Sequence, residues 1–224
     1  PQDLANTSWA FAALAFVAPA LFEVTVSMLP PLLNKSNASV RSQIYQFLLF
    51  LRLEAPQLAS ALVSSEFEAE LREAFLAALE PNPSRTQSEV AAALTRIGWT
   101  HEFEHVTAEG LSLAMAQPDS KLAVEFDGPS HYLADMRGGV AGLPNGRSLF
   151  KRRMLRKLGW RVLHLPYFEW NRLQTSSAQD EYLSRRLADL MKSADDLHVT
   201  SSSPPATTVA EGACGRPPRR PHVD

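Results

Sequence analysis

The sequence contains a single cysteine, Cys214, close to its C-terminus. One thiol excludes an internal disulfide and any zinc site built from several cysteines. The chain also lacks an excess of positive charge, because 22 Lys and Arg residues face 24 Asp and Glu residues and leave a formal net charge of −2. The chain therefore does not bind nucleic acid through an overall positive charge, and any binding to a polyanion depends on a local patch of cations.

No hydrophobic run is long enough to cross a bilayer. The most apolar stretch, WAFAALAFVAPALF at residues 9–22, is interrupted by Pro19 and followed by Glu23. Because a spanning helix needs about 20 apolar residues, this stretch predicts a pair of packed helices and no association with a membrane. The sequence starts with Pro1 and not with Met, so we expect a fragment or a processed product whose targeting segment lies upstream.

Residues 1–80 show the apolar spacing that is typical of helices. Residues 39–53 and 65–79 each place their apolar side chains on one helical stripe, and prolines punctuate the segments before residue 32. Short Ala/Leu-rich helices separated by proline are typical of the end of an α-helical repeat array. The sequence shows no internal period, so a plain helical bundle is the alternative.

After a proline-containing linker at residues 80–85 the apolar period changes. We expect a helix capped by Ser84 or Ser88, then strands and two further helices, which together make an α+β protein. The expected strands are 100–106, 110–117, 121–127 and 160–166; the expected helices are 88–98, 147–158 and 178–192; a glycine-rich loop is expected at 137–146. The predicted organisation is a helical region at residues 1–80, an α/β domain at 84–195 and a disordered tail at 198–224, which has few apolar residues.

The stretch AVEFDGPSHY at residues 123–132 places two acids at the end of a strand. Glu125 and Asp127 are two residues apart and therefore point to the same face. Adjacent carboxylates repel one another, so a divalent metal, a basic side chain or solvent must compensate them. A turn brings His131 back toward this end, where it is a candidate metal ligand, general acid or base, or hydrogen-bonded orienting residue.

The helix expected at residues 147–158 is strongly basic and has no acid among residues 147–157. Its apolar residues form a buried stripe, which predicts that its cations form a positive outer face able to contact phosphates. These cations are Arg147, Lys151, Arg152, Arg153, Arg156 and Lys157. Of the nearby aromatic residues, Trp160 and Phe168 are expected in the core, while Tyr167 or Trp170 could stack on a base if exposed.

Two segments, LAVEFDGPSHY and NGRSLFKRRMLRKLGWRVLHLPYFEWN, resemble the RAP domain, named as an RNA-binding domain abundant in apicomplexans. The resemblance covers about residues 84–175. RAP domains stand at the C-termini of organellar RNA-metabolism proteins, usually after helical repeats. The resemblance therefore implies binding of single-stranded RNA in mitochondria or chloroplasts, in processing, splicing, ribosomal RNA maturation or translation. It also implies other organellar RNA-processing proteins as partners.

The RAP domain is in turn similar to the PD-(D/E)XK nuclease fold, especially the very-short-patch-repair endonucleases. That fold shares a metal between an acid on its second core strand and an acid pair or acid–lysine pair on its third. Glu125 matches the third-strand acid, but Asp127 stands where many of these nucleases have lysine. A hairpin tip at Asp119-Ser120 places Ala114 opposite Glu125, where the second-strand acid is expected. Asp119 itself lies about 20 Å away along the strand and cannot replace it.

Three functions follow from these observations. The first is an RNA-binding module whose nuclease-like fold no longer cuts and which needs no cofactor. The second is a metal-dependent endoribonuclease that uses Glu125, Asp127 and His131 with magnesium or manganese; Ala114 counts against it. The third is a protein-interaction platform in an organellar RNA complex, which the net charge of −2 slightly favours. The basic helix and the loss of the second-strand acid favour the first.

Overall fold

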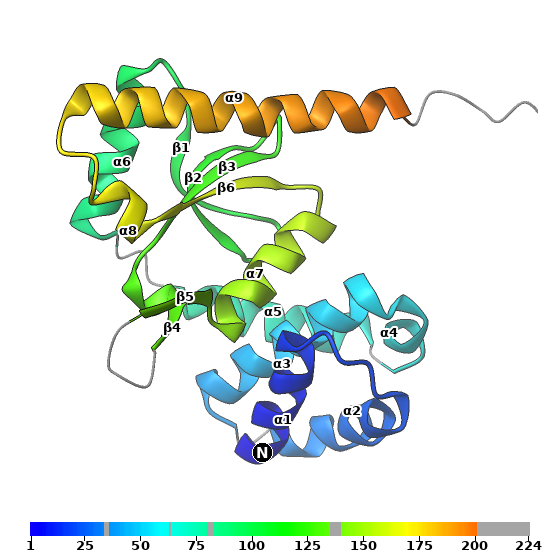
Figure 1. The fold of residues 1–224 in the computed structure, drawn as a ribbon. Coiled ribbons are helices and arrows are strands. Elements are labelled where there is room, and N and C mark those ends of the chain that lie inside the picture. The colour runs from blue at the N-terminus through cyan, green and yellow to red at the C-terminus, as the bar shows by residue number, and fades with distance from the viewer. Residues whose placement is uncertain (34–35, 63, 80–82, 135–139, 201–224) are drawn as a thin grey trace, which may run out of the picture. The chain divides into compact units, whose positions relative to one another are not determined.

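The computed structural model describes residues 1–33, 36–62, 64–79, 83–134 and 140–200 (Figure 1). Its contacts divide the chain into two units, Pro1–Leu190 and Met191–Asp224. The expected disordered tail lies outside the described residues from position 201 onward, and residues 198–200 belong to the last helix. In the described part of the chain, no helix combines the length and the apolar character that a bilayer span requires.

The N-terminal region consists of helices, as the apolar spacing predicts. They are α1 (Gln2–Ala13), α2 (Pro19–Leu33), α3 (Ala38–Glu54), α4 (Pro56–Leu62) and α5 (Ser65–Ala77). Asn37 caps the start of α3, because its side chain accepts a hydrogen bond from the Val40 amide at 3.0 Å. Five consecutive residues of α3, at positions 47–51, are buried. Because four residues cover a full helical turn, α3 is enclosed on all sides, and it contacts α1, α4, α5 and α7.

The C-terminal region is built on a four-stranded sheet with the order β1-β2-β3-β6. Its elements are α6 (Arg85–Arg96), β1 (Glu102–Val106), β2 (Ser112–Gln117), β3 (Leu122–Asp127), η1 (Pro129–His131), β4 (Tyr132–Ala134), β5 (Val140–Pro144), α7 (Gly146–Lys157), β6 (Arg161–Pro166), α8 (Tyr167–Trp170) and α9 (Ser176–Thr200). The first three strands pair antiparallel, and β6 pairs parallel to β3. The chain is therefore α+β, with helices first and a small sheet after them.

Strand β3 is the centre of this region, and all six of its residues are buried. Ala123 packs in one apolar core with α7 and the N-terminal helices, whereas Val124 packs in a second core with α6 and α9. This alternation follows from the period of two along a strand. Helix α7 contacts β6 as well as α1 and α3, so it joins the sheet to the N-terminal helices.

Several helix and loop boundaries in the structure differ from the predicted ones. Helix α6 starts three residues earlier than expected because Ser84 and Gln87 form a capping box. The expected glycine-rich loop lies in part outside the described residues; its described part contains β5, which pairs antiparallel with β4. The last helix runs from Ser176 to Thr200 and not only over residues 178–192, and the Thr175 hydroxyl accepts a hydrogen bond from the Ala178 amide at its start.

Gly110, in the turn between β1 and β2, packs directly on α5. Its φ is +83°, and a Cβ added there would lie 2.9 Å from the Phe75 ring and 3.0 Å from Leu76 Cδ2. We expect Gly110→Ala to lower the free energy of unfolding by ~2–4 kcal/mol, since it adds left-handed strain and a clash. Urea unfolding measures this loss.

Gly98→Ala is the matched control for this prediction. Gly98 also has a positive φ, +78°, but nothing lies within 4 Å of an added Cβ. The control therefore suffers only the backbone strain of ~1–2 kcal/mol. Equal losses of unfolding free energy in the two variants would show that close packing of Gly110 on α5 does not add to the cost.

Candidate functional site

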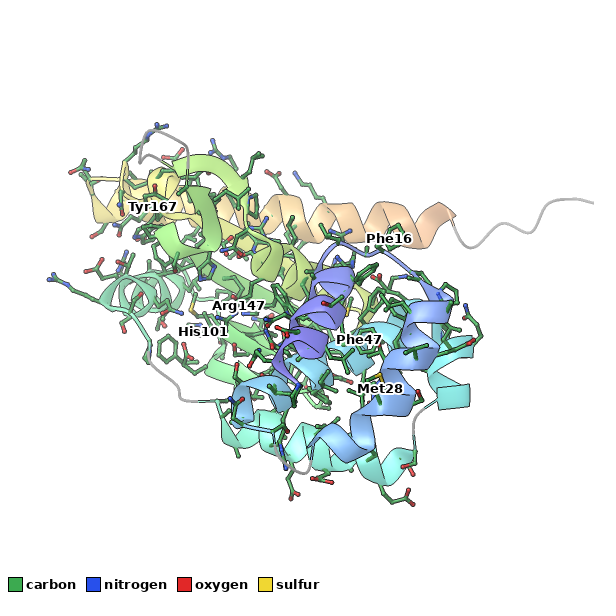
Figure 2. All side chains as sticks on the ribbon, turned by 90° about the horizontal axis from the view of Figure 1, so that it is seen from below. Phe16, Met28, Phe47, His101, Arg147 and Tyr167 are labelled. Atoms are coloured by element: carbon green, nitrogen blue, oxygen red, sulfur yellow. The ribbon has the colours of Figure 1, made fainter. Side chains whose placement is uncertain are left out.

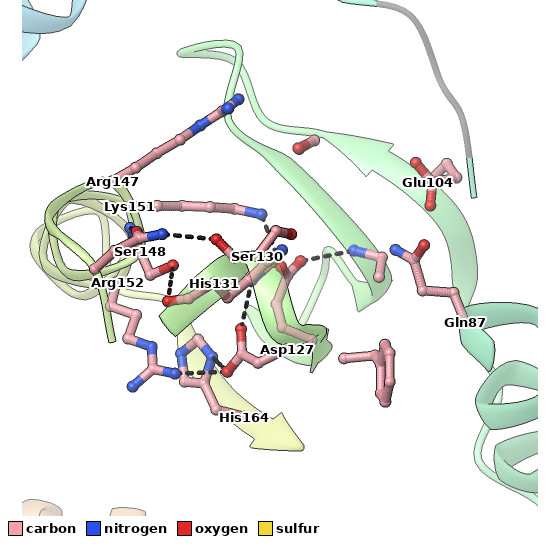
Figure 3. A pocket seen from close by; sticks show the side chains of 15 residues that line it. Gln87, Glu104, Asp127, Ser130, His131, Arg147, Ser148, Lys151, Arg152 and His164 are labelled. Carbon is pink, nitrogen blue, oxygen red and sulfur yellow. Dashed lines mark hydrogen bonds and ion pairs between the residues drawn. The ribbon is translucent and has the colours of Figure 1, made fainter. Parts of the chain in front are cut away.

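A pocket of about 330 Å³ lies at the C-terminal end of β3 and has the size of a small ligand site. Side chains of α7 line one side of it, and Gln87 of α6 and Glu104 of β1 lie on the other (Figure 3). Its ionisable lining residues are Glu104, Glu125, Asp127, His131, Arg147, Lys151, Arg152 and His164. The fold thus brings together both predicted acids, His131 and three of the predicted cations.

Glu125 lies at the buried base of this pocket, with 5% of its surface exposed. Its Oε1 accepts a hydrogen bond from the Ala114 amide at 2.7 Å, and its Oε2 accepts one from Lys151 Nζ at 2.7 Å. The strand pairs Met115 with Val124 and Ala116 with Ala123, the register that the sequence predicts to place Ala114 opposite Glu125. A lysine from α7 therefore compensates this acid.

Asp127 is more deeply buried, with 2% of its surface exposed. Arg152 Nη2 lies 2.5 Å from its Oδ2, His164 Nδ1 lies 3.1 Å from Oδ2, and His131 Nδ1 lies 3.0 Å from Oδ1. Burial by itself would raise the pKa of Asp127, but the hydrogen bonds from His131 and His164 and the charges of His164 and Arg152 hold it well below its ordinary value. The alternative that both acids are simply solvated is wrong.

His131 lies in the geometry of an orienting residue, since its ring nitrogen contacts the Asp127 carboxylate. His164 was missed by the sequence reasoning although it makes the same kind of contact. It stands on β6, and the parallel pairing of β6 with β3 places it directly opposite Glu125. The one available signal was a histidine between two leucines of the predicted strand WRVLHLP.

The six cations of α7 do not form one unopposed outer face. Lys151 and Arg152 point to Glu125 and Asp127, and Arg153 Nε lies 2.8 Å from Glu54 Oε1. For these three the interpretation of an unopposed charge is wrong, because their acids come from elements distant in sequence. The other three cations are exposed and have no acidic partner among the described residues; they are Arg147, Arg156 and Lys157.

The aromatic residues divide between core and pocket rim. Trp160 is buried, as predicted, and Phe168 packs against Tyr132 and Tyr167. Trp170 has only 3% of its surface exposed and packs in the core with α6 and α9, so it does not meet the condition for stacking on a base. Tyr167 is half-buried and lines a neighbouring pocket of about 400 Å³.

Glu104 is a pocket residue that the sequence reasoning did not single out. The register of β1 with β2 pairs Phe103 with Met115 and His105 with Leu113, so Glu104 stands beside Ala114 in the row that continues through Glu125 to His164. Burial raises the pKa of Glu104 and the charge of Glu125 raises it further, while Lys151 opposes both. Its Oε1 is buried without a hydrogen-bond partner among the described residues, and its φ is +55°.

The donor set does not fit the magnesium ion that the nuclease resemblance implies. Both oxygens of Glu125 and both oxygens of Asp127 are engaged by protein donors. Within the described ranges, no three His, Cys, Asp or Glu side chains are grouped so that they could hold a metal. We derive no catalytic step through a metal from this arrangement.

The fold and the pocket thus define a mixed α+β domain with a buried acid–base site, and parts of its sequence are similar to known proteins. Residues 124–186 match the family model of the RAP domain, which confirms that resemblance for the stretch from β3 into α9. The match contains Glu125, Asp127 and the whole of α7, while α6, β1 and β2 precede it.

Two relatives extend the comparison. The chain is 37% identical over 106 residues to a RAP domain-containing protein, chloroplastic, of Oryza sativa subsp. japonica; these residues cover 46% of this chain and 15% of the relative. It is 34% identical over 90 residues to FAST kinase domain-containing protein 1, mitochondrial, of Mus musculus; these cover 37% of this chain and 11% of the relative. The chain therefore matches a small fraction of the length of either relative.

Proposed function

We propose that this chain is an RNA-binding module of organellar RNA metabolism, acting in processing, splicing, ribosomal RNA maturation or translation. The RAP match and relatives named chloroplastic and mitochondrial support this proposal and a location in one of these organelles. We interpret residues 84–195 as a RAP domain with a nuclease-like fold that binds RNA without cutting it, after a helical repeat-like region at residues 1–80.

The observation that carries the proposal is the exposed guanidinium of Arg147. It has no acidic partner among the described residues, and it lines both the main pocket and an adjoining pocket beside α3 and α5. Arg156 and Lys157 add two exposed cations at the other end of α7. Exposed cations beside a polar pocket and along the same helix suit the phosphates of a nucleic acid, which supply most of its electrostatic binding energy.

Neutralising these three cations tests the proposal. We expect the Arg147→Gln/Arg156→Gln/Lys157→Gln variant to bind labelled single-stranded RNA at least ~10-fold more weakly and with a shallower salt dependence, since each lost phosphate contact lowers the salt slope by about one. Fluorescence anisotropy across a salt titration measures both quantities. Lys151 and Arg152 are left intact because removing them would leave buried acids unpaired.

A second triple variant separates specific contacts from total charge. Arg172, Arg185 and Lys192 are exposed cations outside α7, and changing all three to Gln alters the net charge equally. Equal weakening in both triple variants, or none in either, would contradict the proposal. A denaturing gel of the RNA after incubation with magnesium should show intact RNA; shortened RNA would favour the endoribonuclease instead.

A specific observation favours a protein-interaction platform as the second candidate. Large apolar side chains are exposed around α1 and α2, among them Leu14 at 79%, Phe16 at 58% and Met28 at 47% (Figure 2). Exposed apolar patches of this kind mark contacts with further protein, such as other RNA-processing proteins of the organelle. Stable co-purification with a protein partner and no affinity for RNA would support this candidate over the first.

A further inference from the structure

We propose that the pocket at the end of β3 holds a guanine base of single-stranded RNA and that Glu104 is the acceptor that selects it. This assignment rests on the RNA binding proposed above and adds to it the identity of the base.

Glu104 has an unmet requirement for hydrogen-bond donors. Its Oε1 is buried and has no partner among the described residues, and the residue as a whole lines an open pocket. Its backbone is held at φ +55°, a conformation that is unfavourable for a residue with a side chain. Buried acceptors are nearly always satisfied, and strained residues gather where ligands are held. The occupant of the pocket must therefore bring donors to this carboxylate.

A metal ion does not meet this requirement. Glu125, the nearest candidate co-ligand along the row of strands, already accepts from the Ala114 amide and from Lys151. In the described part of the chain, no three His, Cys, Asp or Glu side chains are placed so that they could hold a metal ion. N–H groups meet the requirement, and a nucleobase presents them on its Watson–Crick edge.

Guanine matches the groups on both sides of Glu104. A carboxylate accepts two parallel N–H bonds, and guanine alone among the four bases presents two adjacent donors, N1–H and the N2 amino group. Uracil presents one N–H between two carbonyls, and adenine and cytosine place a ring-nitrogen acceptor beside their amino group. Gln87 supplies a donor for the carbonyl of guanine. Its Oε1 accepts a hydrogen bond from the Ser84 amide, and its Nε2, which has no partner among the described residues, can donate to guanine O6.

The surroundings suit a base within a strand and not only a free nucleotide. A pocket of about 170 Å³ shares Ser112, Arg147 and Lys151 with the main pocket. The pocket that Tyr167 lines shares Gln87, Phe126, Ser130 and His131 with it. The flanking nucleotides can therefore continue in both directions, with a phosphate near Arg147 and a base near Tyr167, where stacking is available.

Four uridine-rich RNAs that differ only in one central base, G, A, C or U, test the assignment by anisotropy. We expect the unmodified chain to bind the guanosine RNA at least ~10-fold more tightly than the others, the discrimination typical of a bidentate contact. Glu104→Gln should abolish this preference and keep the affinity for the uridine RNA, because a neutral amide has one acceptor and repels one of the two donors. Glu181→Gln, an exposed glutamate of α9, should keep the preference, and thermal melting confirms that both variants fold.

The possible outcomes separate the two proposals. Equal binding of all four RNAs would overturn the guanine assignment and leave the proposed function intact. A preference for adenosine or cytidine would also overturn it, since it would mean that Glu104 acts as a protonated donor. A guanosine preference that survives in Glu104→Gln would place the selection elsewhere and overturn the role of Glu104. Failure to bind any RNA would overturn the proposed function together with the assignment.

Discussion

Asp127→Asn is expected to lower the free energy of unfolding at pH 7 by ~3–5 kcal/mol, the cost of breaking a buried charge network. The carboxylate accepts from His131, His164 and Arg152 and is 98% covered, since 2% of its surface is exposed. An asparagine has one acceptor where the aspartate has two, and its NH₂ group faces a donor. The substitution therefore leaves the Arg152 guanidinium half-buried without its counter-charge.

The same network predicts how stability depends on pH. The pKa of Asp127 is lowered in the folded chain, so its contribution is fully present above the ordinary aspartate value of about 3.9. It is lost progressively as the pH falls below that value toward the folded pKa. The difference in unfolding free energy between the unmodified chain and Asp127→Asn should therefore shrink as the pH falls from 4 to 2.

Urea unfolding at several pH values between 2 and 7 measures both effects. Asp119→Asn is the matched control, because Asp119 is exposed in the turn between β2 and β3; its effect should stay within about 0.5 kcal/mol. An Asp127→Asn chain as stable as the control at pH 7 would contradict the network. So would a stability difference that persists unchanged at pH 2.

Arg153→Met is expected to lower the free energy of unfolding by ~2–3 kcal/mol, less than for a fully buried pair because its side chain is 21% exposed. Arg153 Nε lies 2.8 Å from Glu54 at the end of α3, and its guanidinium also donates to the carbonyls of Ala12 and Ala13 in α1. One side chain of α7 thus satisfies groups at the C-terminal ends of two N-terminal helices. Methionine keeps much of the apolar stem and removes these bonds.

A double-mutant cycle with Glu54→Gln measures the coupling between the two side chains. We expect a coupling of at least ~1 kcal/mol, as for residues in one hydrogen-bond network. Arg156→Met serves as the control, because Arg156 is exposed on the same helix and has no acidic partner among the described residues. Additive effects of Arg153→Met and Glu54→Gln would show that this contact does not hold α7 against α3.

Local patterns were sufficient for much of the fold. The apolar period placed α3 and α5, and the change of period after the linker, with the turn at Pro118-Asp119-Ser120, placed β1, β2 and β3 within one or two residues. The turn at Asp119-Ser120 determined the register of β2 and β3, so the position of Ala114 beside Glu125 was predictable. These features depend on neighbours close in sequence, which is why a single sequence reveals them.

The partners of the charged residues were not predictable in this way. Helix α7 has no acid of its own, yet Lys151, Arg152 and Arg153 meet acids 26, 25 and 99 residues away. The burial of Trp170 and the row that brings Glu104 beside Ala114 also depend on which elements pack together. Each of these depends on contacts between distant segments, and one sequence carries no direct signal for such contacts.

The amino-acid sequence by itself determined the α+β class, the order of the four sheet strands and of the longer helices around them, the two-residue spacing of Glu125 and Asp127 and the basic character of α7. Only the tertiary structure decided which cations are neutralised and which remain exposed, and that Glu104, whose Oε1 has no hydrogen-bond partner among the described residues, lines the pocket. The physical reason is that periodicity fixes which face of an element is apolar, whereas the charge balance of a site is set by side chains that meet only when the elements have packed.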